Sequence, residues 1–448
     1  MLEKYKVYYR TLFVVFWATT CYGFISDELL PFLDGLKSAF LALIDVVFLI
    51  LGLTLIRSKR DVFILVSFVL ISLLSSFVIN RISFLHFLNG FRDFLGLLFA
   101  LPIVIFFIKG PHAQDFKRRF DKQLFIWLCI QPFCLIWQCV KYGAGDHGGG
   151  SFGDLESGMC SMFIYLISFY LVYQKWDFND YWGSVKKNKL YLFLLFPTYL
   201  NETKASFIYL ALYLILLYKP TKASIVKLLY IIPIFIFIFI GIGKAYLKLT
   251  NQEDRSFDQA FFMKYFVGEE GEVEDIKDMY YRLDEGEFDY LSAAEIWAVD
   301  IPRFAKLFLM FDAIQDSKGG IIAGAGLGQF KGGTIFDSPT FYKQYPWLLI
   351  GSRPWMFFLF IQLGLLGFLW FFPTIWVQLH TGPKLRFPGN RMLLFLLFCL
   401  FLIMFYNDSL RKISECVIFF YFICVSRFLL FPKNESVSNR DNEKTVND

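Results

Sequence analysis

Charged residues are scarce in this chain of 448 residues: Asp, Glu, Lys and Arg make up 19% of it, against about 25% in ordinary soluble domains. Apolar residues reach 56%, aromatic residues reach 20%, and the mean hydropathy is +0.51. So little charge on so apolar a chain excludes a water-soluble globular domain. The composition predicts an all-α integral membrane protein, since helices satisfy their own backbone hydrogen bonds in lipid.

Patterns typical of disulfides, metal sites and nucleic-acid binding are also lacking. All eight cysteines fall inside apolar segments, and the four histidines show no paired spacing. We therefore expect no disulfide framework and no metal or other cofactor. The net charge of +5 is spread over short connectors, so no basic patch predicts nucleic-acid binding. His147 could act as a base, although an ordinary solvated histidine is the better interpretation.

Long apolar runs are what the sequence does have. About 20 helical residues cross the roughly 30 Å hydrocarbon core of a bilayer. We expect twelve spans, at residues 11–25, 38–56, 61–80, 93–109, 123–141, 158–175, 189–200, 204–218, 227–247, 353–378, 391–406 and 413–431. The first run lacks a small-residue cleavage site, which favours a retained span over a signal peptide.

Basic connectors alternate with acidic or glycine-rich connectors along the chain. Lys and Arg clusters precede the first span and follow the second, fourth, sixth, eighth and tenth. The positive-inside rule assigns these clusters to the cytoplasm and predicts cytoplasmic termini. The predicted organisation is spans one to nine in residues 1–248, a large periplasmic loop in 249–351, spans ten to twelve in 352–431, and a disordered cytoplasmic tail in 432–448.

The outer side also receives the Gly143–Gly158 connector, and the large loop changes character along its length. The loop opens acidic, and Ser292–Ala313 carries apolar residues on one face, which predicts an amphipathic helix. Gly319–Gly333 is rich in glycine and predicts repeated turns. The aromatic stretch Phe336–Leu349 is expected along the membrane interface.

Basic residues at the outer membrane edge are the main candidate site residues. They are Arg92, Lys204, Arg303, Arg353 and Arg411. Convergent cations suit a diphosphate, because guanidinium donors pair with phosphate oxygens in bidentate fashion. The structural alternative is that each side chain reaches the headgroups or pairs with a nearby acid, namely Asp93, Glu202 or Asp408. Ionisable groups are costly at this depth, so five on one side favour a function.

Local motifs around these cations resemble a known family. Arg303 is followed by an apolar helical run and the turn Gly324-Ala-Gly-Leu-Gly-Gln-Phe330, while Gln362-Leu-Gly-Leu-Leu-Gly367 lies in the tenth span and Thr203-Lys204 opens the eighth. With the twelve-span layout and the large loop after span nine, these motifs resemble the bacterial O-antigen ligase and O-antigen polymerase (Wzy-type) superfamily. The motifs cover roughly residues 190–370.

The resemblance implies a multi-pass glycosyltransferase of the bacterial inner membrane. It would use a polyprenyl-diphosphate-linked oligosaccharide at the periplasmic face, with membrane lipids and a chain-length regulator protein as partners. On this hypothesis the catalytic cations are Arg303, Arg353 and Lys204, and the substrate contacts are Arg92, Gly324, Gly326, Gly328, Tyr342 and Tyr345. Interface anchoring is the alternative role for the two tyrosines.

Ligases of this family carry a His-Asn pair where this chain has Arg353-Pro354. A fixed cation cannot serve as a general base, which favours a polymerase over a ligase that transfers glycan to a lipid acceptor. A transporter or flippase for lipid-linked sugar is the alternative from another class, and it predicts broken spans, midplane polar residues and two related halves. A structural or sensory membrane protein is the third alternative. The general base is unassigned.

Overall fold

The computed structural model describes residues 2–143, 147–154, 156–201, 205–218, 303–330, 338–345, 348, 354–384 and 389–430. Every regular element within these ranges is a helix, which confirms the all-α prediction for them. Seven helices among them are long and apolar enough to cross a membrane, as expected of a multi-pass membrane protein. They coincide with the second to fifth and the tenth to twelfth expected spans. The ninth, at 227–247, lies outside the described residues.

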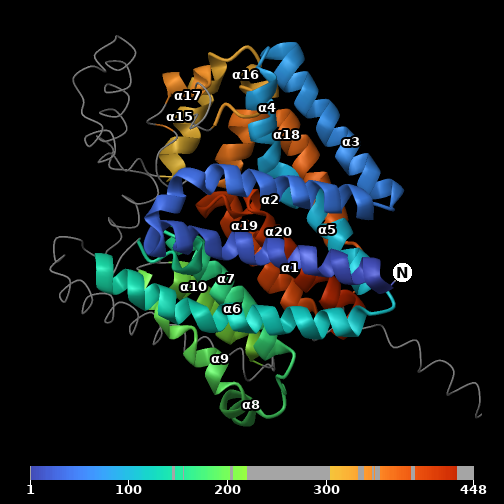
Figure 1. Ribbon diagram of the computed structural model, residues 1–448, viewed down its shortest axis with the longest axis vertical. Helices are drawn as coiled ribbons and strands as arrows, with labels where there is room; N and C mark the ends of the chain where they lie inside the picture. The colour runs from blue at the N-terminus through green and yellow to red at the C-terminus, as the bar shows by residue number, and fades with distance from the viewer. Residues whose placement is uncertain are drawn as a thin grey trace, which may run out of the picture.

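The helices follow one another along the chain as Figure 1 labels them. The α-helices are α1 (Leu2–Phe24), α2 (Asp34–Leu55), α3 (Lys59–Leu73), α4 (Phe84–Phe91), α5 (Leu95–Ile108), α6 (Ala113–Tyr142), α7 (Ser157–Tyr173), α8 (Tyr181–Lys187), α9 (Lys189–Phe193), α10 (Ala205–Leu217), α15 (Arg303–Gln315), α16 (Gly320–Ala323), α17 (Thr340–Gln344), α18 (Trp355–Leu379), α19 (Gly389–Tyr406) and α20 (Ile413–Val425). Short 3-10 or π turns are η1 (Ile25–Leu29), η2 (Pro31–Leu33), η3 (Leu74–Ile79), η4 (Arg92–Phe94), η5 (Gly150–Phe152), η6 (Phe196–Asn201), η9 (Ser409–Arg411) and η10 (Ser426–Leu430).

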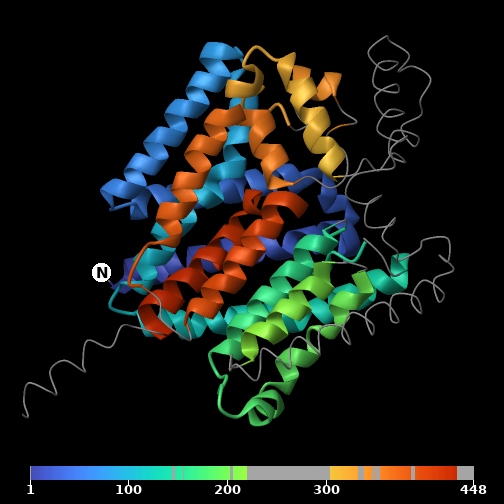
Figure 2. The ribbon, with the colours of Figure 1, turned by 180° about the vertical axis from the view of Figure 1, so that it is seen from behind.

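Helices α5 and α20 form the centre of the bundle. Both sequences are apolar on all sides, the pattern of a helix that other helices surround. Almost every residue of each is buried, and α5 packs along α20 and against α2. In Figures 1 and 2, α1, α2 and α6 cover one face of this centre, and α19 is seen beside α20 from the other face.

Some of the basic connectors lie close together at one end of the bundle. Arg60 donates to the Thr381 hydroxyl, and the Lys109 ammonium lies over the Phe428 ring at 4.8 Å. The acidic η1 turn and the loop between α19 and α20 lie at the opposite end. This grouping agrees with the charge pattern of the sequence, and which end faces the cytoplasm stays a prediction. We name the end that holds η1 and the loop between α19 and α20 the outer end, after its predicted side.

Helix α18, expected as one straight span, turns back on itself at Gly364. The backbone of Gly364 has φ +58° and ψ −148°, which no helix contains. The rings of Trp355 and Phe371 lie 5.8 Å apart, whereas a straight helix would separate these positions by roughly 24 Å at 1.5 Å per residue. The expected span at 353–378 is therefore present as two helices joined at Gly364, because a glycine with positive φ lets the chain reverse inside an apolar run.

Two glycine-rich segments are described, and the second in chain order, residues 319–330, packs against the break in α18. The break frees the carbonyls of Ile361 and Gln362 from helical partners, and these accept from the amides of Ala325 at 2.7 Å and Gly326 at 2.9 Å. The Gln362 side chain also accepts from the Gly328 amide at 2.8 Å. Two distant sequence motifs thus satisfy each other's backbone groups, as buried backbone requires.

The first glycine-rich segment, residues 147–154, inserts between α1 and α6 in a different way. The Gln138 side chain accepts from the Gly150 amide at 2.8 Å and donates to the Gly150 carbonyl at 3.2 Å. Gln131 accepts from the Ser151 amide at 2.9 Å. The continuous helix α6 thus supplies side-chain amides that bond to the backbone of this segment, as the backbone of a neighbouring strand or helix would.

Candidate functional site

The loop between α19 and α20, residues 407–412, closes the outer end of the bundle. The amide of Trp355, at the start of α18, donates to the Asn407 carbonyl at 2.9 Å, and Asn407 Oδ1 accepts from the Ser409 amide at 3.1 Å. The loop therefore holds the beginning of α18 against the end of α19.

Arg411 is the central cation of this loop. It forms ion pairs with Asp408 and, at 3.6 Å, with Asp93 of η4. Its guanidinium lies 4.7 Å from the ring centre of Phe358 in α18 and 5.5 Å from that of Phe330 in the second glycine-rich segment. Burial lowers the pKa of Arg411, but the two carboxylates more than offset this and hold the pKa above its ordinary value. Arg411 is thus a fixed charge shared by several elements.

Buried polar atoms without a hydrogen-bond partner among the described residues are concentrated around this loop. We name the residues that carry them the Arg411 cluster: Trp355 (Nε1), Asn407 (Nδ2), Ser409 (Oγ), Arg411 (Nε), Ser414 (Oγ) and Glu415 (both Oε). Buried polar groups are almost always hydrogen-bonded, so such a cluster calls for a polar partner from outside the described residues. It offers both donors and acceptors to that partner.

Three of the predicted cations have no described side chain. Lys204 and Arg353 lie outside the described residues, and Arg303 begins α15 with only its backbone described. The helix expected over Ser292–Ala313 is present from Arg303 onward. The catalytic assignment of these three residues stays a prediction.

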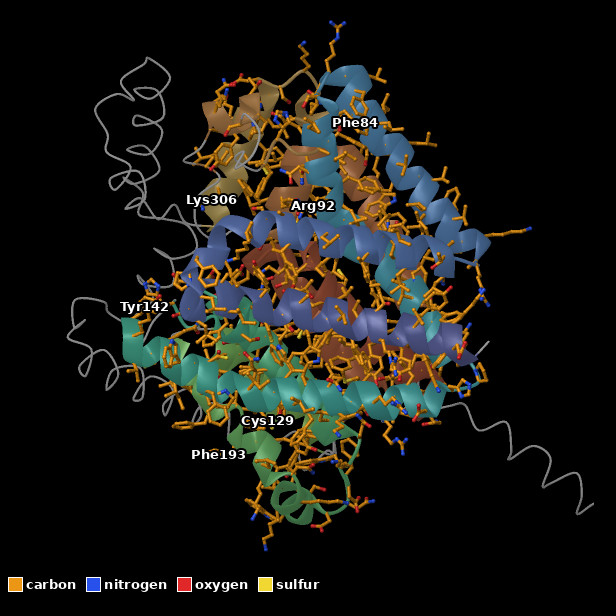
Figure 3. The ribbon with its side chains drawn as sticks, viewed as in Figure 1. Phe84, Arg92, Cys129, Tyr142, Phe193 and Lys306 are labelled. Carbon is orange, nitrogen blue, oxygen red and sulfur yellow. The ribbon has the colours of Figure 1, made fainter. Side chains whose placement is uncertain are left out.

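Arg92 is described, and it forms an ion pair that the sequence did not suggest. Its Nε lies 2.6 Å from a carboxylate oxygen of Asp45 in α2, and Figure 3 shows it between α2 and α4. The expected neighbour, Asp93, pairs with Arg411 instead. Both pairs join helices that are distant in sequence, so they hold the outer end of the bundle together.

The glycines assigned to substrate contact lie at a buried crossing of helices. Consecutive amides of the second glycine-rich segment, from Gly324 to Gly328, donate to Gly320, Ile361, Gln362, Ser76 and the Gln362 side chain. A Cβ on Gly328 would lie 1.8 Å from the His86 carbonyl oxygen of α4. These contacts give Gly324, Gly326 and Gly328 a packing role, and substrate contact stays a prediction.

The two tyrosines assigned to sugar stacking lie near α17. Tyr345 is only 2% exposed, and its hydroxyl donates to Asp316. Tyr342 is half-buried and packs against the core. The placement of Tyr345 fits packing better than ring stacking on a sugar, because stacking needs an exposed ring face.

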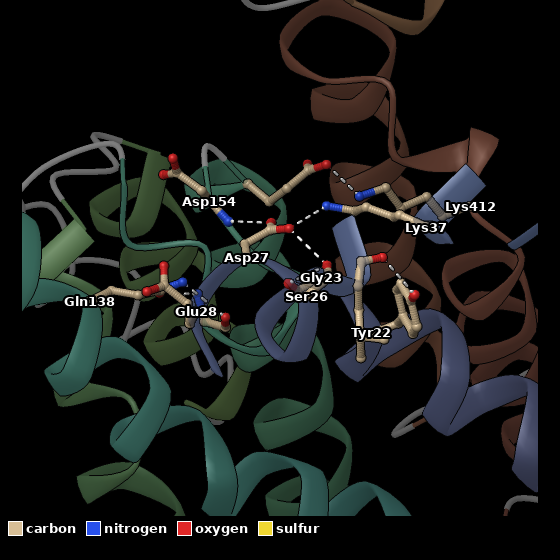
Figure 4. A network of polar contacts seen from close by, with 12 residues as sticks. Tyr22, Gly23, Ser26, Asp27, Glu28, Lys37, Gln138, Asp154 and Lys412 are labelled. Atoms are coloured by element: carbon tan, nitrogen blue, oxygen red, sulfur yellow. Dashed lines mark hydrogen bonds and ion pairs between the residues drawn. The ribbon is translucent and has the colours of Figure 1, made fainter. Parts of the chain in front are cut away.

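A band of ion pairs continues from the Arg411 cluster across the outer end (Figure 4). Lys412 pairs with Glu156 at 2.6 Å, and Lys37 pairs with Asp27 at 2.6 Å. Asp27 also accepts from the Asp154 amide at 3.3 Å. His147 pairs with Asp154 through Nδ1 at 2.8 Å. The band connects η1, α2, the first glycine-rich segment and the loop before α20.

Glu415 and Asp45 are the site residues that sequence reasoning missed. Each is an acid within an apolar run, and ionisable groups there are costly enough to mark a role. That signal is readable in the sequence. Lys306 of α15 is also buried, with 1% of its surface exposed (Figure 3). Within the described residues, no three His, Cys, Asp or Glu side chains are grouped as metal ligands.

Comparison with known proteins adds no identification. No family model matches the chain, and no curated protein or solved structure matches it significantly.

Proposed function

We propose that this chain is a membrane glycosyltransferase that polymerises a surface polysaccharide from polyprenyl-diphosphate-linked repeat units. A hydroxyl of the acceptor sugar attacks the anomeric carbon of the donor, the bond from that carbon to the diphosphate breaks, and polyprenyl diphosphate leaves. Negative charge develops on the leaving oxygen, and fixed cations in a site that excludes water stabilise it best.

One observation carries this proposal. The two motifs with the clearest family resemblance, Gly324–Phe330 and Gln362–Gly367, lie far apart in sequence and contact each other through the Gly326 and Gly328 amides. Their junction places Phe330 against Arg411 at the outer end. Two glycine motifs without a shared function are not expected to contact each other beside a buried arginine.

The proposed cations for the diphosphate are Arg303, Arg353 and Lys204. Arg92 is a weaker candidate than these three, because its charge is already paired with Asp45. Arg411 supplies a fixed positive charge near Phe358, at the beginning of α18. Asp93 and Asp408 neutralise this charge in part.

The test is an assay of purified protein in liposomes that contain lipid-linked repeat units. A polymerase lengthens the glycan on the lipid, and Arg353→Ala and Lys204→Ala abolish this without loss of membrane level. Arg118→Ala, at an exposed position on the opposite end, is the control. Wild-type protein that leaves glycan length unchanged would contradict the proposal, and transfer to an added lipid acceptor alone would indicate the ligase.

The reversal of α18 favours a second candidate, a transporter of lipid-linked sugar, since broken helices line many transport sites. In such sites the freed carbonyls coordinate an ion or substrate. Here the carbonyls of Ile361 and Gln362 accept from Ala325 and Gly326 instead. In the same liposomes, movement of lipid-linked sugar between leaflets without lengthening would identify the transporter.

A further inference from the structure

Glu415 is an acid in the first turn of α20, and it is 2% exposed. Neither of its carboxylate oxygens makes a well-formed hydrogen bond to a described residue, although the Ser409 hydroxyl lies near enough to stabilise its charge. The polar groups that act on it are Lys412, Glu156, Asp408 and Ser409. Burying an ionised carboxylate without well-formed hydrogen bonds is costly, and an ionisable group inside a span usually has a role.

The other carboxylates at this end are engaged with cations. Asp93 and Asp408 pair with Arg411, and Glu156 pairs with Lys412. A carboxylate held by a cation is a weaker proton acceptor, because the cation stabilises the ionised form. Glu415 is the carboxylate of the Arg411 cluster whose oxygens make no such bond among the described residues.

The donors of the cluster complement Glu415. Trp355 Nε1 and Asn407 Nδ2 are buried and make no hydrogen bond to a described residue, and Trp355 contacts Asn407 through its backbone. A ligand that uses both the donors and the acid accepts hydrogen bonds from Trp355 and Asn407 and gives a proton to Glu415. A sugar hydroxyl has this chemistry, since one oxygen both accepts and donates.

We propose that Glu415 is the general base that takes the proton from the attacking hydroxyl, an inference that rests on the function proposed above. As the acceptor oxygen bonds to the anomeric carbon, its proton passes to Glu415. The electron pair of the broken carbon–oxygen bond leaves with the diphosphate. The protonated Glu415 then returns its proton to water, so the step needs no further reactant.

The competing explanation for Glu415 is structural, because an acid in the first turn of a helix interacts favourably with the helix dipole. The two explanations differ for Glu415→Gln, which keeps the size of the side chain and removes the base. A base predicts that the Gln variant keeps its thermal stability but loses turnover and the acidic limb of the rate profile, whereas a dipole role predicts that it loses thermal stability and keeps that limb.

The experiment measures glycan lengthening by the full-length protein in liposomes over a range of pH, together with retention of the lipid-linked donor. We expect Glu415→Gln to slow turnover by about 100-fold or more, to bind donor as the wild type does, and to lose the acidic limb of the rate profile. Glu28→Gln is the matched control, because Glu28 is a buried acid at the same end that accepts from Lys141 at 2.9 Å.

Two outcomes overturn the inference, and they can be told apart. If the wild type lengthens glycan and Glu415→Gln does so at a similar rate with an unchanged pH profile, the base assignment is wrong and the proposed function stands. If the wild type does not lengthen glycan, the proposed function fails and the base assignment fails with it.

Discussion

The two glycine-rich segments of this protein both insert among helices, but different parts of the chain hold them. Side chains of the continuous helix α6, Gln131 and Gln138, hold the first segment. The backbone of α18, broken at Gly364, holds the second. A segment held by side chains depends on a few amides, whereas a segment held by backbone depends on how closely two main chains can approach.

The comparison predicts that glycine replacement in the second segment has the largest effect. Gly328 has φ +86°, and an added Cβ would meet the His86 backbone at 1.8 Å. We expect Gly328→Ala to lower the free energy of unfolding by about 2–5 kcal/mol, from positive-φ strain and overpacking. Thermal unfolding of the protein in detergent measures this.

The matched control for that change is Gly320→Ala. Gly320 has φ +49°, yet a Cβ there meets nothing within 4 Å. Strain alone predicts a loss of about 1–2 kcal/mol. Equal losses at the two positions would show that close approach of the backbones does not matter.

Removal of a supporting side chain should come next. Gln138→Leu removes two hydrogen bonds, to the amide and to the carbonyl of Gly150, and at about 0.5–1.5 kcal/mol for each bond we expect a loss of about 1–3 kcal/mol. Gln114→Leu, at an exposed position of the same helix, is the control. A melting temperature that Gln138→Leu leaves unchanged would mean that the first segment does not depend on α6.

The corresponding change beside the second segment should cost less. Gln362→Leu removes the acceptor of the Gly328 amide, but the carbonyls of Ile361 and Gln362 keep their bonds to the segment. We expect a loss of about 1–2 kcal/mol, measured in the same unfolding experiment. A loss larger than that of Gln138→Leu would reverse the comparison.

The smallest effect is expected at His147 in the first segment. Its pair with Asp154 is half-exposed, and surface pairs contribute about 0–1 kcal/mol. His147→Ala should leave unfolding nearly unchanged and should also leave glycan lengthening unchanged. A strong loss of activity would instead return His147 to the role of base and argue against Glu415.

Much of the fold could be predicted, because it follows from composition within single segments. The apolar runs gave the positions of α2, α3 and α6, since length and hydropathy are enough to identify a helix that can cross a membrane. The turns of 319–330 were also expected from glycine content. The reversal of α18 was not, since Gly364 lies in an apolar run where nothing adjacent to it in sequence signals a break.

The candidate site was predicted less well, because charge pairing depends on contacts between helices. Arg92 has Asp93 beside it in sequence, but it pairs with Asp45, which lies close to it in space. Arg411 was recognised as an outer cation together with its neighbour Asp408, and the structure added Asp93 and the rings of Phe330 and Phe358.

By itself the sequence determined that this chain is helical, apolar and divided by charge into two ends, because each of these properties is local to a run of residues. Only the tertiary structure decided that the glycines of 319–330 pair with the break in α18 and that Glu415 lies buried near Asp408 and Ser409. The physical reason is that a buried hydrogen bond or charge is satisfied by whichever group is near in space, and nearness in space is created only when the helices pack.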